Sequence, residues 1–139
     1  MKGKKFLALL LGVTTILGTA VIPVAAQALT ENFHVYHYGG AVVSSNAAQK
    51  EDTSNYMGFA VDKRYGTTVN WVTSETVYLR GRTSGGTQCT SLASVNQPAS
   101  GAMTYASGYA TYGSYYRLAV QYADANPYTH LDLTASWAP

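Results

Sequence analysis

The 139-residue chain has a single cysteine, Cys89, so no disulfide can form within it. Small exported domains usually depend on such bonds. We interpret Cys89 as a half-buried strand residue, and a disulfide to a second chain is the alternative. Charged residues are also few, at 12% of the chain, and there are only four prolines.

Long apolar runs are confined to the first 28 residues. There Lys2, Lys4 and Lys5 precede an apolar run over residues 6–20, and Ala26-Gln27-Ala28 follows as an A-x-A pattern. This order is typical of a cleaved secretory signal peptide, and Pro23 and the short run disfavour the alternative of a membrane anchor. We therefore expect a signal peptide at 1–28, a single secreted domain at 29–139 and no membrane span after cleavage. The lysine-rich signal and the lack of disulfides are compatible with a Gram-positive origin.

The charge balance changes once the signal peptide is set aside. The full chain has nine basic and seven acidic residues, but residues 29–139 contain six basic and seven acidic residues, which gives a net charge of −1. A nucleic-acid partner depends on an excess of basic residues. We therefore expect no nucleic-acid partner.

Helix signals are weak after residue 28, whereas alternation of apolar and polar residues is strong. In "HLDLTASW", Leu131, Leu133, Ala135 and Trp137 share one face, which predicts a strand with one buried side. The segment 116–122 repeats the pattern, because Tyr116, Leu118, Val120 and Tyr122 alternate with polar or small residues. The segment "ADANPY" lies between the two strands, and its Asn126-Pro127 favours a turn, so we predict that they form a C-terminal hairpin.

A second hairpin is predicted upstream. The segments "ETVYLRGRT" and "QCTSLAS" flank Ser84-Gly85-Gly86-Thr87, and Gly-Gly is a common two-residue turn. A turn there places Leu79 opposite Leu92 on the buried face and directs Tyr78, Arg80 and Arg82 outward.

Less distinct strand patterns occur in "NFHVYHY", "NYMGFAV" and "TVNWVT". The segment "SSNAAQKEDTSN" at 44–55 is predicted to be a polar connector and is a candidate for a mobile loop. Seven or eight short strands without an internal repeat predict an all-β fold, a small antiparallel β-sandwich, with a small β-barrel as the alternative.

Several of these features together resemble a family of uncharacterised small exported tyrosine-rich β-domain proteins of Gram-positive bacteria. The features are the signal peptide, the "YLRGR" strand, and a final Y-x-x-L-x-L-x-A-S-W-A-P that closes on Trp137-Ala138-Pro139. The resemblance covers the C-terminal half. It implies an exported β-rich protein and no particular reaction.

Catalytic signatures are scarce. The chain has no G-x-S-x-G elbow and no phosphate-cradling glycine loop. His34 and His37 form H-x-x-H, but residues three apart on a strand face opposite sides, so they share a metal only if the backbone turns between them. His130 is a distant third ligand, and Cys89 with a histidine is a candidate nucleophile pair. We expect no enzyme activity, no metal and no cofactor, and an enzyme that uses Cys89 or the histidines is the third hypothesis.

Tyrosine is abundant, with five of its twelve copies in "YASGYATYGSYY" at 105–116. Glycines interrupt the helix-like spacing, so we predict a turn or bulge between Gly108 and Gly113. This turn directs Tyr116 to the core, Tyr115 the opposite way, and Tyr109 and Tyr112 to an exposed bend. Exposed tyrosine with Ser and Gly is typical of adaptable binding surfaces, whereas tyrosine also pairs across strands for structural reasons alone.

The predicted binding residues are Tyr78, Arg80, Arg82, Tyr109 and Tyr112. Arginines, with Arg117 among them, can add contacts to anions or stack on aromatic faces. The first hypothesis is a secreted, non-catalytic protein with an extracellular or cell-surface interaction role. It would contact a cell-wall glycan, an anionic wall polymer or a surface protein, as a monomer or with weak self-association. The alternative is a bacteriocin-like exported factor that acts on neighbouring cells.

Overall fold

The protein is an all-β sandwich of two open antiparallel sheets. The computed structural model describes residues 28–36, 40–62, 76–123 and 130–139, which contain nine strands. This architecture confirms the predicted β-sandwich, and the barrel alternative is wrong because the two sheets stay open. None of the described residues belongs to a helix of the length and hydropathy needed to cross a membrane.

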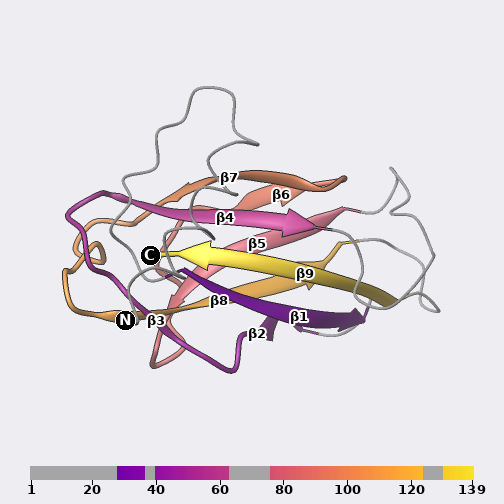
Figure 1. Ribbon diagram of the computed structural model, residues 1–139, viewed down its shortest axis with the longest axis horizontal. Coiled ribbons are helices and arrows are strands. Elements are labelled where there is room, and N and C mark those ends of the chain that lie inside the picture. Colours follow the sequence, from indigo (N-terminus) through magenta and orange to yellow (C-terminus); the bar gives the residue numbers. More distant parts are fainter. Residues whose placement is uncertain (1–27, 37–39, 63–75, 124–129) are drawn as a thin grey trace, which may run out of the picture.

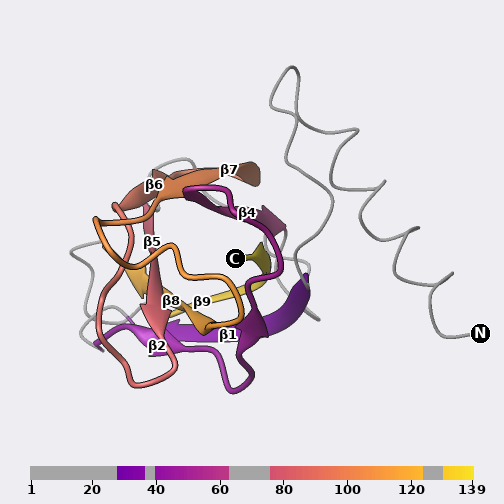
Figure 2. The ribbon, with the colours of Figure 1, turned by 90° about the vertical axis from the view of Figure 1, so that its left-hand side faces the viewer.

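The two sheets contain strands from distant parts of the chain. The four-stranded sheet has, in order, β1 (Leu29–Tyr36), β9 (His130–Ala138), β4 (Tyr56–Asp62) and β7 (Ala99–Thr104). The five-stranded sheet has β2 (Val42–Val43), β8 (Tyr115–Tyr122), β5 (Val77–Thr83) and β6 (Ala93–Val95), and β3 (Ala48–Gln49) also pairs with β8. Figure 1 shows β9 between β1 and β4, and Figure 2 looks along the long axis, with β5 and β4 on opposite sides of the core.

The core forms where the inward faces of the two sheets meet. The alternation read from the sequence is confirmed on both late strands. The inward residues of β9 are Leu131, Leu133, Ala135 and Trp137, and those of β8 are Tyr116, Leu118, Val120 and Tyr122, all buried. Burial of such side chains contributes about 1.5–3 kcal/mol each, so these two strands supply much of the apolar contact between the sheets.

The predicted C-terminal hairpin is wrong. Strand β8 pairs with β5, β2 and β3, whereas β9 pairs with β1 and β4 in the other sheet. The physical reason is that a turn signal indicates where the chain reverses but not which sheet the next strand joins. Strand β9 joins the opposite sheet, so its apolar face and that of β8 line the core from two sides. The turn residues Asn126-Pro127 lie outside the described residues.

The second hairpin forms where predicted, but its two-residue turn and its register are wrong. The chain reverses over three residues, 84–86, and of its two glycines Gly86 has the positive φ, 94°. Thr83 and Thr87 are joined by a backbone hydrogen bond of 2.9 Å, and Arg82 pairs with Gln88. Farther along, Leu79 pairs with Ala93, and Leu92 is 45% exposed instead of facing the core. Between these two pairs β5 advances three residues, from Arg82 to Leu79, whereas the partner segment advances five, from Gln88 to Ala93. The two extra residues of the partner segment bulge out of the strand pairing. In this bulge Cys89 enters the core, 1% exposed, rather than lying half-buried as expected.

Of the less distinct strands, "NFHVYHY" overlaps β1 and "NYMGFAV" overlaps β4. The segment "TVNWVT" lies outside the described residues.

The connector at 44–55 is an ordered part of the fold, so its interpretation as a mobile loop is wrong. Lys50 is completely buried, and its Nζ donates to Asp52 at 2.5 Å and to Ser54 at 3.2 Å. The ammonium also lies 5.1 Å from the ring centroid of Tyr105, within the range of a cation–π contact. A lysine in a polar segment is usually solvated, so no sequence pattern indicates this burial.

The first turn of the same connector is fixed by Glu31 of β1. The carboxylate accepts hydrogen bonds from the backbone and side chains of Ser45 and Asn46 at 2.8–3.1 Å. Partial burial alone would raise the pKa of Glu31, but these hydrogen bonds outweigh it and hold the pKa below its usual value.

We expect a single substitution in the Lys50–Asp52 pair to destabilise the protein more than a double substitution does. Asp52→Asn leaves a buried ammonium without its carboxylate, so we expect the free energy of unfolding to fall by about 3 kcal/mol or more. The double variant Lys50→Met/Asp52→Asn removes both charges and should be closer to the unmodified protein. Urea unfolding followed by tryptophan fluorescence measures both. A double variant less stable than Asp52→Asn would contradict this account.

Candidate functional site

The outer face of the five-stranded sheet carries three of the predicted binding residues. On β5, Val77, Leu79 and Gly81 are buried, so the alternate residues Tyr78, Arg80 and Arg82 point away from the core. All three are half-buried, and their outward direction is as predicted from the sequence. We call this surface, together with the outward residues of β8, the arginine face.

A hollow of about 340 Å³ lies on the arginine face. Its lining includes Tyr78, Arg80, Arg82, Gln88, Ala119 and Gln121. The cross-strand register explains its shape: Arg80 lies opposite Ala119 on β8, and Tyr78 lies opposite Gln121. A methyl group opposite a long arginine leaves space above the sheet, and the amides and the tyrosine border that space.

Each of the two arginines in the hollow makes one side-chain hydrogen bond within the described part of the chain. A guanidinium has five N–H donors. Arg80 donates through Nη1 to the Gln88 side chain, and Arg82 donates through Nη1 to the Gly86 carbonyl at 3.4 Å. The Nε atom of each is buried and has no hydrogen-bond partner among the described residues. A buried donor without a partner costs about 1–3 kcal/mol. Because these Nε atoms are buried, a ligand in the hollow would meet the Nη groups instead.

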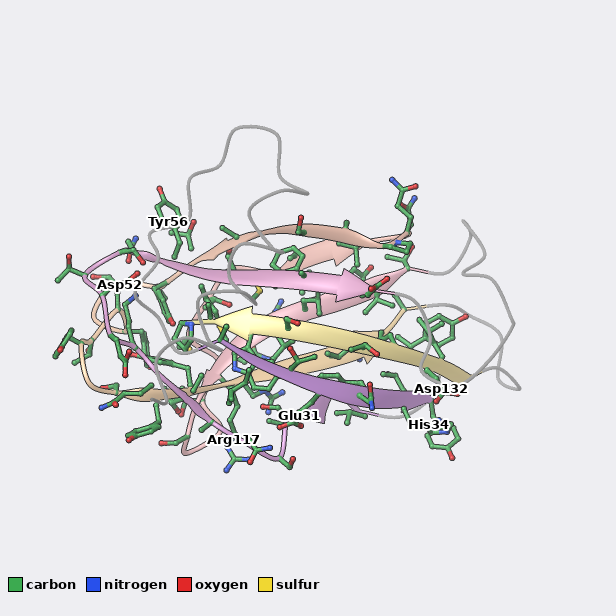
Figure 3. All side chains as sticks on the ribbon, viewed as in Figure 1. Glu31, His34, Asp52, Tyr56, Arg117 and Asp132 are labelled. Atoms are coloured by element: carbon green, nitrogen blue, oxygen red, sulfur yellow. The ribbon has the colours of Figure 1, made fainter. Side chains whose placement is uncertain are left out.

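Arg117 on β8 is the third cation of this face and lies directly opposite Arg82. Like charges directly opposite one another destabilise a strand pair. Arg117 is fixed by hydrogen bonds from its Nη1 to the carbonyls of Ser44 and Ser45 at 2.8 and 2.9 Å, and its Nε is also buried without a partner. Figure 3 shows Arg117 and Glu31 near the same edge of the molecule, where each binds the turn at Ser44–Asn46.

Residues 105–116, which we call the tyrosine bend, carry the other two predicted residues. Gly108 and Gly113 have positive φ of 85° and 80°, which confirms the predicted turn between them. Tyr112 is 68% exposed as expected, whereas Tyr109 is half-buried and packs against the core. The hydroxyl of Tyr116, which is buried, donates to the Tyr109 carbonyl and accepts from the Thr111 amide. The core therefore fixes the shape of this bend.

A second hollow, of about 360 Å³, lies between the tyrosine bend and the end of β5. Tyr109 and Tyr115 are part of its lining, together with Thr83 and Ser84. Tyr115 is 48% exposed and shares the outward side of β8 with Arg117. The two hollows therefore lie along the same strand pair, on either side of the Arg82–Arg117 pair.

The structure thus brings together Tyr78, Arg80 and Arg82 on the arginine face, whereas Tyr109 and Tyr112 lie apart from them in the tyrosine bend, which continues into the first residues of β8. The initial set did not include Tyr115 and Gln121. Their alternation with buried Tyr116 and Tyr122 is a signal by which the sequence could have placed them on the outer face.

Cys89 is poorly suited to act as a nucleophile. It is buried, and burial raises the pKa of its thiol from an ordinary value of 9.0 to about 11. A thiolate is the nucleophilic form, so little of it exists near neutral pH. The neighbouring Tyr105 also has a raised pKa, chiefly because it is buried.

The histidines do not form a site within the described residues. His34 lies on the exposed side of β1 and is hydrogen-bonded to Asp132. Its ring is edge-on to the ring of Tyr36, and the two ring centroids are 4.6 Å apart. Figure 3 shows His34 and Asp132 at one end of the sandwich and Asp52 at the other. His37 and the side chain of His130 lie outside the described residues. Across the described ranges, no three His, Cys, Asp or Glu side chains are grouped to hold a metal ion.

The raised pKa of Cys89 predicts a loss of stability at alkaline pH. The unfolded chain releases the thiol proton near pH 9, whereas the folded protein keeps it until about pH 11. The folded state binds more protons in this window, so the free energy of unfolding should fall by about 1–3 kcal/mol as pH rises through it. Urea unfolding at several pH values tests this. Cys89→Ala should show a shallower pH dependence, and an unchanged slope would contradict the role of the thiol.

Comparisons of the chain with protein-family models, with curated proteins and with solved structures found no match to any of the three.

Proposed function

We propose that this chain is an exported, non-catalytic binding protein that acts outside the cell or at the cell surface through its arginine face. The observation that carries the proposal is the hollow lined by Arg80 and Arg82, two guanidinium groups with five N–H donors each. Their Nη groups can donate to an oxyanion or a hydroxyl group of a ligand. The signal-peptide pattern at residues 1–28 supports export.

The shape of the surface favours a glycan over a protein as partner. The two hollows, of about 340 and 360 Å³, are at the lower end of the size range for small-ligand pockets, which are concave, whereas protein partners usually bind over a broader surface. A sugar unit has one apolar face and many hydroxyl groups. Tyr78 and Tyr115 offer aromatic surface, and Gln88 and Gln121 offer amide donors and acceptors. We therefore propose a glycan of the cell wall as the partner.

Co-sedimentation of the purified protein with purified Gram-positive cell walls tests this function. We expect the protein to pellet with the walls, and Tyr78→Ala or Tyr112→Ala to weaken retention about five- to tenfold, because each removes roughly 1 kcal/mol of aromatic contact. Tyr56→Ala is the matched control. Tyr56 is 55% exposed on β4, in the other sheet, so its loss should leave retention unchanged.

Two results would contradict the proposal. One is that the unmodified protein stays in the supernatant. The other is that all three tyrosine variants lose retention equally, since this would show a general loss of adhesion rather than a defined surface.

A further inference from the structure

We propose that the arginine face binds a linear polyanion, a glycan or polyol chain that carries one oxyanion in each repeat, laid along strands β5 and β8. This inference rests on the proposed function and names the ligand class of the same surface. The recognised chemistry is a phosphate or carboxylate oxyanion that meets Arg80, Arg82 and Arg117.

The positions of the cations favour a ligand with repeated charges. Arg80 and Arg82 are two residues apart on β5, so their Cα atoms are separated by about 6.6 Å along the strand. Arg117 lies directly opposite Arg82 on the neighbouring strand. Arg80 and Arg82 thus form a row along β5, and Arg117 lies beside Arg82 on β8, so one end of the row has two cations. A chain with regularly spaced anions can contact every member of this row, whereas a single small anion can contact only part of it.

The arginine side chains are held in place before any ligand arrives. Arg80 is bound by Gln88, Arg82 by the Gly86 carbonyl, and Arg117 by the carbonyls of Ser44 and Ser45. These bonds use Nη1 in each case. A guanidinium can present its two Nη groups together as a fork to two oxygens of one oxyanion. Binding therefore requires little further ordering of these side chains.

Charge segregation adds to the argument. The ion pairs among the described residues are His34–Asp132 and Lys50–Asp52, and neither involves the arginine face. Glu31 accepts its hydrogen bonds from Ser45 and Asn46. A domain with a net charge of −1 thus has a cationic surface that no carboxylate of the described residues neutralises. An anionic ligand would also relieve the repulsion between Arg82 and Arg117.

Aromatic residues at the two ends of the row indicate what connects the anions. Tyr78 borders the first hollow, and Tyr115 borders the second. Tyrosine rings pack well against the C–H groups of a sugar or polyol, and a bare inorganic polyphosphate has none. This placement favours an organic polyanion.

Titration calorimetry with the purified protein tests the inference. The probes are poly(glycerol phosphate), polygalacturonate as the carboxylate polymer, dextran as a neutral polymer, and inorganic phosphate. We expect at least one of the two polyanions to bind, dextran not to bind, and inorganic phosphate to bind at least tenfold more weakly than the polymer. Binding should weaken as NaCl is raised from about 50 to about 500 mM, because salt screens exposed charges.

Four variants separate a specific site from general attraction. Arg80→Gln and Arg82→Gln should each weaken polymer binding about tenfold or more, since a charge-assisted hydrogen bond is lost. Arg82→Lys keeps the charge without the fork and should give an intermediate affinity. Tyr56→Glu lowers the net charge by the same amount at an exposed position of the other sheet and should change binding less than about threefold. Circular dichroism of each variant verifies that the fold is intact.

The outcomes also separate this inference from the proposed function. If the protein pellets with cell walls but binds neither polyanion, or if Tyr56→Glu weakens binding as much as Arg82→Gln, the inference is overturned and the wall-binding function stands. Equal binding of dextran, or binding of inorganic phosphate as tight as that of the polymer, overturns it too. If the protein does not bind cell walls at all, the proposed function itself fails.

Discussion

The buried ammonium of Lys50 joins the parts of the molecule that regular strand pairing does not reach. Its side chain binds Asp52 and Ser54 and lies against the ring of Tyr105. Its backbone bonds to Ser114 and Gly113 in the tyrosine bend. The connector between the two sheets and the tyrosine bend therefore share one anchor. A buried charge tolerates few arrangements of its partners, so this residue gives both irregular segments a defined shape and sets where the exposed tyrosine stands.

The arginine face shows the opposite treatment of charge. Within the core, the ammonium of Lys50 has a carboxylate, a hydroxyl group and an aromatic ring as partners. On the outer face, three guanidinium groups have buried Nε atoms without partners among the described residues. Two of these groups lie directly opposite each other. Neither feature helps the sheet to fold. Places where a structure departs from what stability alone would favour are often places of function. The contrast between these two environments is the strongest reason to assign a role to this surface rather than to His34 and Asp132 on the other sheet.

The sequence predicted the faces of the strands well and their neighbours poorly. Alternation identified the inward residues of β8 and β9 and the outward direction of Tyr78, Arg80 and Arg82. Alternation says which side of a strand is buried, but not which sheet contains it, so the local turn signal after β8 led to a wrong hairpin. The hollow could not be predicted either, since it depends on the register that places Ala119 opposite Arg80. The burial of Lys50 depends on contacts made across more than fifty residues.

Strand β9 has a position that affects the order of events when the chain folds. It lies between β1 and β4 and supplies Trp137 and three further core residues, so without it the four-stranded sheet divides into two separate pieces. Strand β1 begins at Leu29, and its partner begins a hundred residues later. Contacts so distant in sequence form late, and sheets built on them fold slowly. The four-stranded sheet thus cannot be completed until about residue 138 has been synthesised. A polypeptide whose last strand completes a sheet is not fully folded before its synthesis ends, and an incompletely folded chain can still be threaded through a narrow pore.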